Sequence, residues 1–119
     1  MNSVLDLSRL EEIFGPDGTA IHAFIVDLQA AVEALAVQIE TECSAAAWPR
    51  ARLALHEFVG MCGTGGCAEL SAIGEYIRAA IVDERYADVP GAIDRLRAAL
   101  ERLRHTVRGT LPLLASAEK

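Results

Sequence analysis

Apolar residues recur every three or four positions along most of the chain, a spacing that places them on one face of an α-helix. Two long stretches, 18–44 and 90–110, show the regular alternation of fours and threes that is typical of helices packed lengthwise on one another. Their seam residues are Ile21, Ile25, Leu28, Val32, Leu35 and Ile39 in the first and Ile93, Leu96, Leu100, Leu103 and Val107 in the second. No segment alternates with a period of two residues, so no strand is predicted.

Shorter amphipathic stretches at 48–64 and 67–85 predict two further helices, and a short helix is expected at about 3–14. Glycine, proline and aspartate cluster at the breaks between these elements, at 15–18, 63–66 and 88–91, with a softer break at 44–49. Helices joined by short breaks pack antiparallel. The sequence therefore predicts an all-α fold, an antiparallel up-down four-helix bundle with a short extra N-terminal helix and a weakly patterned tail at 111–119.

Composition narrows the class of protein. A chain of 119 residues, 52% of them apolar, matches one domain over 1–119 with a sufficient core. The net charge of -6 would repel a nucleic-acid backbone, so DNA and RNA are not expected as partners. The N-terminus lacks a signal-peptide pattern, and no stretch approaches the ~20 apolar residues needed to span a bilayer, so a soluble cytoplasmic protein is predicted. Three cysteines in such a chain are expected to be reduced and mostly buried.

His56 differs from the other two histidines, His22 and His105, which occupy ordinary flanking positions on the long helices. It follows the apolar Leu55, so it turns about 100° away from the core and is expected to be partly exposed on the rim of its helix. Positions four and seven residues beyond it are Gly60 and Gly63, which leave no side chain beside the imidazole. Two interpretations remain open: these glycines give a partner access to His56, or they let neighbouring helices pack and turn.

An imidazole is partly neutral and nucleophilic at cellular pH, and a phosphoryl group placed on it is readily passed on. Such a site needs a nearby cation. If the chain turns at Gly65, Arg78 on the next helix lies within about 6 Å of His56 in height, at ~1.5 Å per residue. Arg52, one turn before His56, is a second candidate. An alternative role for both arginines is that they only keep the protein surface soluble.

The segment from His56 to Cys67 resembles the signature of histidine phosphotransfer (HPt) domains, in which a phosphoacceptor histidine precedes a hydrophobic residue, a lysine, a glycine and a glycine-bearing turn. The matching residues are His56, Phe58, Gly60, Gly63 and Gly66. The likeness extends over about residues 5–110. Val59 departs from it, because it stands where the family usually has a lysine.

The resemblance implies a phosphocarrier, not a turnover enzyme, that relays a phosphoryl group between receiver-domain aspartates through His56. It implies a receiver domain of a response regulator or hybrid kinase as partner, and no cofactor on this chain, since the magnesium belongs to the receiver. Docking is expected on the 51–63 face and around Ile73 to Ile81. A degenerate HPt-like module that binds a kinase or receiver without being phosphorylated is the alternative, and an unrelated helical adaptor is a third.

Two other sites are disfavoured. Gly63 to Gly66 follow no predicted strand and precede no Gly-Lys-Ser/Thr ending, which argues against a nucleotide loop. Cys62 and Cys67 lack zinc-site spacing and an evident fourth ligand, so no metal site is predicted.

Overall fold

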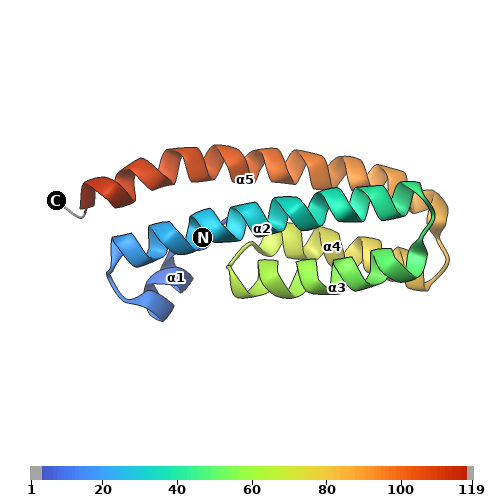
Figure 1. The fold of residues 1–119 in the computed structure, drawn as a ribbon, viewed down its shortest axis with the longest axis horizontal. Helices are drawn as coiled ribbons and strands as arrows, with labels where there is room; N and C mark the ends of the chain where they lie inside the picture. Colours follow the sequence, from blue (N-terminus) through green and yellow to red (C-terminus); the bar gives the residue numbers. More distant parts are fainter. Residues whose placement is uncertain (1–3, 118–119) are drawn as a thin grey trace.

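The computed structural model describes residues 4–117, and every regular element in that range is a helix (Figure 1). The elements, in chain order, are α1 (Leu7–Phe14), α2 (Gly18–Ser44), α3 (Trp48–Thr64), α4 (Ala68–Val82), the short 3-10 helix η1 (Tyr86–Asp88) and α5 (Val89–Ala117). The four longer helices lie along one axis, and successive ones run in opposite directions, while α1 lies at the end where α2 begins (Figure 1). The prediction of an all-helical chain is confirmed for these residues.

The apolar seams form the core of this helical bundle. Every predicted seam residue of α2 and α5 is buried, together with Leu55, Phe58 and Cys62 from α3. The helix α2 packs against α3 and α5, and α4 packs against the same two helices from the other side. Each helix thus buries one stripe against two neighbours, which is the arrangement that a 3.5-residue seam favours.

Capping residues account for several of the helix starts. Asp6 accepts a hydrogen bond from the backbone N–H of Arg9 at the start of α1, and Asp17 accepts from Thr19 and Ala20 at the start of α2. A side-chain oxygen at this position satisfies N–H groups that have no partner within the helix. The expected start of the first helix near residue 3 lies outside the described residues, and the described helix begins only at Leu7.

The bounds of α4 differ from the predicted range of 67–85. The helix ends at Val82, and Glu84 has a φ of 58°, a left-handed conformation that cannot continue a right-handed helix. The N–H groups of Glu84 and Arg85 donate to the carbonyls of Ile81 and Ala80, so the end of α4 is closed by hydrogen bonds before η1 begins. The turn geometry, rather than the apolar pattern, ends this helix.

The helix α5 continues to Ala117 and does not end near residue 110 as predicted. It passes through Pro112, which has no N–H to donate and normally disfavours a helix interior. Leu111 and Leu114 are partly buried and pack against the core. These apolar contacts stabilise the extra turns across the proline, so the expected tail at 111–119 is helical as far as the structure describes it.

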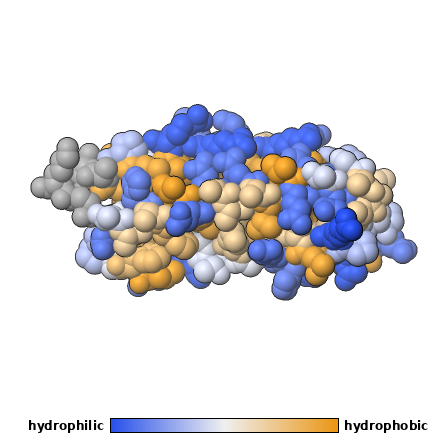
Figure 2. Space-filling view, in the orientation of Figure 1, coloured by the Kyte–Doolittle hydropathy of each residue, from blue (hydrophilic) through white to orange (hydrophobic). Residues whose placement is uncertain are grey.

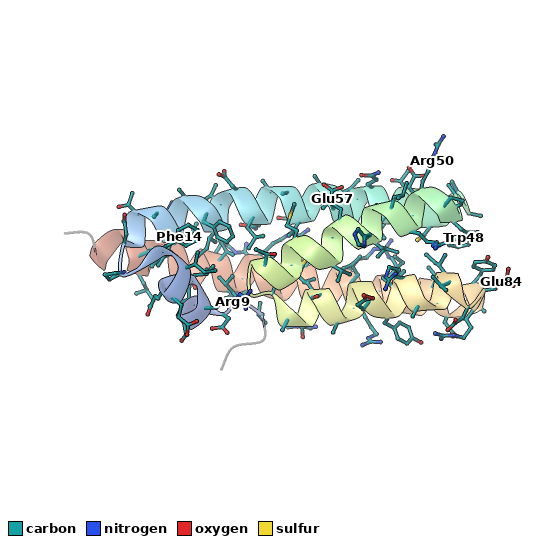
Figure 3. The ribbon with its side chains drawn as sticks, turned by 90° about the horizontal axis from the view of Figure 1, so that it is seen from below. Arg9, Phe14, Trp48, Arg50, Glu57 and Glu84 are labelled. Carbon is teal, nitrogen blue, oxygen red and sulfur yellow. The ribbon has the colours of Figure 1, made fainter. Side chains whose placement is uncertain are left out.

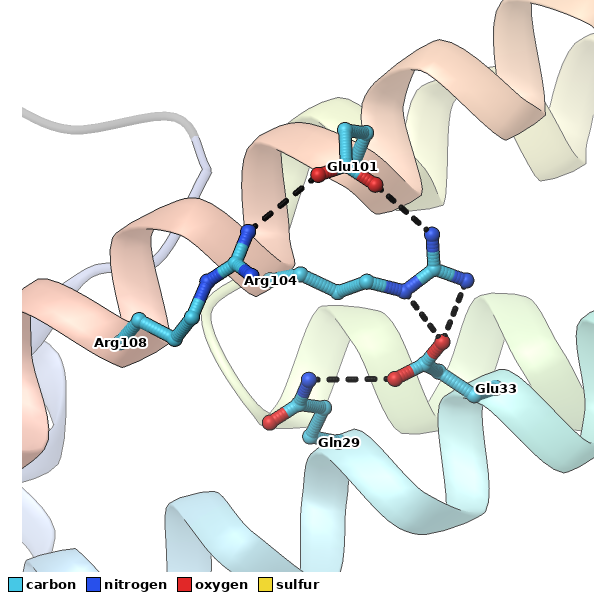
Figure 4. A network of polar contacts seen from close by, with 5 residues as sticks. All are labelled: Gln29, Glu33, Glu101, Arg104 and Arg108. Carbon is cyan, nitrogen blue, oxygen red and sulfur yellow. Dashed lines mark hydrogen bonds and ion pairs between the residues drawn. The ribbon is translucent and has the colours of Figure 1, made fainter.

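Three arginines of α5 form ion pairs with other helices. Arg97 pairs with Glu40 on α2, Arg102 with Glu69 on α4, and Arg104 with Glu33 on α2. Figure 4 shows the largest group, in which Glu33 accepts from Arg104 Nε at 2.6 Å and from Gln29 at 3.1 Å, while Glu101 joins Arg104 to Arg108. These contacts link α5 to α2 and α4.

By length and composition, α2 could cross a membrane, which corrects the expectation that no stretch of the chain would do so. Its most apolar 18-residue window has a mean hydropathy of 1.6 and no more than two charged residues. The buried part of that window is the seam that packs against α3 and α5. A core helix of a helical bundle meets the same criterion, so this property alone does not indicate a membrane protein.

Candidate functional site

His56 lies on the outer face of α3 and is exposed, as its position one residue past the buried Leu55 predicted. It lines two surface depressions, one toward α2 and one toward α4. Figure 3 shows Glu57, the next residue, midway along α3, between Trp48 at the start of that helix and the α3–α4 turn. The imidazole is therefore accessible on the long side of the bundle and away from its ends.

The depression toward α2 is a largely apolar groove of about 580 Å³. Phe24, Leu28, Ala31 and Met61 supply its apolar walls, and Gly60 lies on the α3 side. Asp27 and Glu57 also line it and place two carboxylates beside the apolar walls. The residues of α2 that line this groove were not predicted from the sequence. Phe24, a large aromatic residue next to the seam residue Ile25, is the sequence feature that could have indicated them.

The depression toward α4 has a volume of about 430 Å³ and brings both predicted arginines to His56. Arg52 and Arg78 line it together with His56, Pro49 and Leu53. Leu53, one turn before His56, is 73% exposed. Two cations therefore border the same hollow as the imidazole, one from its own helix and one from the neighbouring helix, as the antiparallel spacing predicted.

The two arginines differ in their pairing. Arg78 Nε donates to Glu75 Oε2 and Arg78 Nη2 donates to Glu75 Oε1, both at 3.1 Å. These hydrogen bonds raise the pKa of Arg78 above its ordinary value. Arg52 forms no ion pair with any residue in the described part of the chain. The pairing of Glu75 with Arg78 was not predicted from the sequence. The spacing could have indicated it, because an acidic and a basic residue three positions apart on a helix can form an ion pair.

The structure assigns the glycines near His56 to two different roles. A Cβ built on Gly60 meets nothing within 4 Å, and one on Gly63 meets only Ser71 Oγ at 3.9 Å. A Cβ on Gly65 would lie 2.6 Å from a methyl carbon of Leu28, and Gly66 has a φ of 78°. Gly60 and Gly63 are thus not required for helix packing and leave open space along the face of His56, whereas Gly65 makes room for Leu28 of α2 and Gly66 provides the left-handed residue of the turn.

Val59, at the position where the resemblance expects a lysine, is half-buried and turned toward α4. Its Cγ2 would lie 2.9 Å from a Cβ on Gly74, and its backbone carbonyl accepts from Ser71 Oγ at 3.4 Å. Val59 therefore belongs to the α3–α4 contact and provides no polar group to the surface.

The isoleucines of α4 in the stretch expected to contact a partner face the core. Ile73, Ile77 and Ile81 are all buried in the core, at 4%, 0% and 3% exposure. These apolar side chains form the packing stripe of α4, whereas Glu75, Tyr76 and Ala79 in the same stretch are exposed. Docking on this part of α4 stays a prediction, but the three isoleucine side chains are not part of the exposed surface. Exposed large apolar side chains occur on several helices, among them Leu53 on α3, Val26 and Val37 on α2, and Tyr76 and Val82 on α4. Figure 2 shows hydrophobic patches over α2 and α1, whereas hydrophilic residues gather over α5.

The three cysteines are free, with Cys62 and Cys67 buried and Cys43 half-buried. Burial raises the pKa of the Cys62 thiol to about 12 and that of Cys67 to about 11, so both are protonated near neutral pH. In the described part of the chain, no group of three or more His, Cys, Asp or Glu side chains is placed to hold a metal ion.

No protein-family model, no curated protein and no solved structure matches this chain.

Proposed function

We propose that this chain is an HPt-type phosphocarrier, built as an up-down four-helix bundle, that relays a phosphoryl group between receiver-domain aspartates through His56. The observation that carries the proposal is the surroundings of His56: an exposed imidazole with open space at Gly60, an apolar groove on one side and two arginines on the other. The resemblance of residues 56–67 to the HPt signature points the same way.

In the proposed transfer, the neutral nitrogen of His56 attacks the phosphorus of an aspartyl phosphate on the receiver. A P–N bond forms, the P–O bond to the aspartate breaks, and the aspartate leaves as a carboxylate. The ring then loses its N–H proton to solvent. A second receiver aspartate reverses these steps, so the phosphoryl group passes on and His56 is regenerated. The chain is a carrier rather than a turnover enzyme.

Arg78 and Arg52 are the proposed cations for the phosphoryl group, in place of the lysine that Val59 replaces. Both line the hollow on the α4 side of His56. A guanidinium pairs with phosphoryl oxygens through two parallel hydrogen bonds, which suits it to this role. The positive charge would come from α4 and from the turn of α3 before His56, because the side chain of Val59 is apolar.

The α2–α3 groove is the proposed receiver-docking surface, together with the outer face of α3 from 51 to 63. Its apolar walls at Phe24, Ala31 and Met61 line the same groove as His56, so a receiver docked there would exclude water around the transferring group. The partner would be the receiver domain of a response regulator or of a hybrid kinase. The chain would need no cofactor, since Mg²⁺ for the aspartyl half-reaction would be held by the receiver. Nucleic acid and membrane are not among the proposed partners, and the proposed location is the cytoplasm.

The test is to charge a receiver domain with acetyl phosphate and Mg²⁺, desalt it, and follow acid-labile phosphate on this chain. Phosphoramidate serves in parallel as a donor that needs no receiver. Wild type should be labelled at His56 by both donors, His56→Gln should not be labelled at that position, and Arg78→Ala should retain less label. His105→Gln is the matched control, because His105 is also exposed but lies on α5. Equal labelling of wild type and His56→Gln would overturn the proposal.

A degenerate HPt-like module that binds a kinase or receiver without being phosphorylated is the second candidate. Val59 favours it, and so does the engagement of Arg78 by Glu75. The two functions share the groove but differ in chemistry. Receiver binding that survives His56→Ala, combined with no labelling of wild type by either donor, would support the binding module.

A further inference from the structure

The ion pair between Glu75 and Arg78 lies at the edge of the hollow that contains His56. Both oxygens of Glu75 accept hydrogen bonds from Arg78, and the two side chains are 47% and 40% exposed. Arg78 lines the hollow with His56 and Arg52. The cation expected to meet the phosphoryl group is therefore already bound by a carboxylate on its own helix.

A phosphoryl group on His56 would compete with Glu75 for this guanidinium. It carries close to two negative charges at neutral pH, whereas Glu75 carries one, and it offers three acceptor oxygens. Exposed ion pairs contribute little to stability, so Arg78 can leave Glu75 without unfolding the helix. The same argument does not apply to Arg52, which forms no ion pair with a carboxylate in the part of the chain that the structure describes.

We propose, resting on the function proposed above, that Glu75 is a positioning residue that controls how much of the time Arg78 contacts the phosphoryl group on His56. It thereby sets the lifetime of the phosphohistidine. In hydrolysis, a water oxygen attacks phosphorus, the P–N bond breaks, the imidazole takes up a proton and inorganic phosphate leaves. In a loose transition state the transferring group resembles metaphosphate, with one negative charge, whereas the phosphoryl group on His56 carries close to two. A guanidinium paired with the phosphoryl oxygens therefore stabilises the phosphohistidine more than the transition state for hydrolysis.

Glu75→Gln keeps the shape of the side chain but removes its charge, so Arg78 is released toward His56. The phosphohistidine of Glu75→Gln should decay more slowly than that of wild type, by roughly three- to tenfold. Arg78→Ala should decay faster than wild type. In the double variant, Glu75→Gln should have no further effect, because Glu75 acts only through Arg78. Glu75→Asp, which keeps the charge, should decay at close to the wild-type rate.

The experiment labels each variant with phosphoramidate, removes the donor on a desalting column, and follows the decay of phosphohistidine at pH 8. Urea unfolding of the unlabelled variants reports any change in stability separately. Arg52→Ala is the matched control for removal of a cation from the same hollow. A purely structural role for Glu75 would give the same change in decay rate with and without Arg78.

The outcomes separate this inference from the proposed function. If wild type is not labelled at His56 by either donor, the proposed function fails and this inference fails with it. If wild type is labelled but Glu75→Gln decays at the wild-type rate or faster, this inference alone is overturned. The inference would also be overturned if Glu75→Gln slowed phosphohistidine decay equally with and without Arg78. A third contrary result would be faster phosphohistidine decay in Arg52→Ala but not in Arg78→Ala.

Discussion

Gly74 lies directly against Phe58 across the contact between α4 and α3. A Cβ on Gly74 would lie 2.9 Å from Phe58 Cδ1 and 2.9 Å from Val59 Cγ2, closer than real Cβ contacts come. Phe58 is fully buried, so its ring has little freedom to move away. This contact holds the helix that carries His56 close to the helix that carries Arg78, and it makes Gly74 a structural requirement of the site.

The first prediction contrasts Gly74 with Gly60. Gly74→Ala should lower the free energy of unfolding by roughly 1–2 kcal/mol, because overpacking costs ~1–3 kcal/mol and helix propensity returns up to ~1 kcal/mol. Gly60→Ala should instead raise it by ~0.5–1 kcal/mol, because its Cβ enters open space. Urea unfolding of both variants at pH 7 is the measurement. Equal effects of the two substitutions would contradict the packing described for Gly74.

The second prediction concerns access to His56. Gly60→Leu adds a side chain one turn beyond the imidazole on the same face, so transfer from a charged receiver should fall by at least about tenfold. Labelling by the small donor phosphoramidate should fall much less. Gly109→Leu is the control, since Gly109 is equally open but lies on α5. Unchanged receiver transfer in Gly60→Leu would show that the partner does not approach along this face.

A third prediction tests the contact between α2 and α5. A double-mutant cycle on Glu33→Gln and Arg104→Ala should give a coupling of about 0.5–1 kcal/mol, the upper range for partly exposed pairs. The same cycle on Glu101 and Arg108, which are 63% and 69% exposed, should give almost none. Urea unfolding of the single and double variants at low salt provides the values. A coupling for Glu33 and Arg104 as small as that of the control pair would contradict a stabilising role of this link between α2 and α5.

The fourth prediction is a loss of stability at alkaline pH through Cys62. The folded thiol has a pKa of about 12, above the ~8.5 of an unfolded cysteine, so the folded state holds its proton more tightly. The stabilisation is fully present below pH 8.5 and is lost as the pH rises from about 8.5 to about 12, by about 2 kcal/mol by pH 10. The slope of unfolding free energy against pH between 8 and 10.5 should be less steep in Cys62→Ala. An identical slope in both proteins would contradict the burial of this thiol.

Much of the helical framework follows from the sequence by itself, because the periodicity of apolar residues is a local property. The seams at Ile21 to Ile39 and Ile93 to Val107 identify two helices and their buried faces, and Leu55 next to His56 places the imidazole on the rim. The position of Arg78 beside the same hollow follows from counting residues on either side of a turn. Each of these inferences needs only helix geometry and the direction of the chain.

The tertiary structure decided what depends on contacts between segments far apart in the chain. Apolar contacts of Leu111 and Leu114 extend α5 beyond Pro112, and the burial of Ile73, Ile77 and Ile81 removes them from any docking surface. Whether a glycine serves packing or access depends on what lies opposite it, which is open space for Gly60 and Phe58 for Gly74. The periodicity of a sequence states which face of a helix is buried, but not which neighbour covers it, and that neighbour determines the groove and the cations around His56.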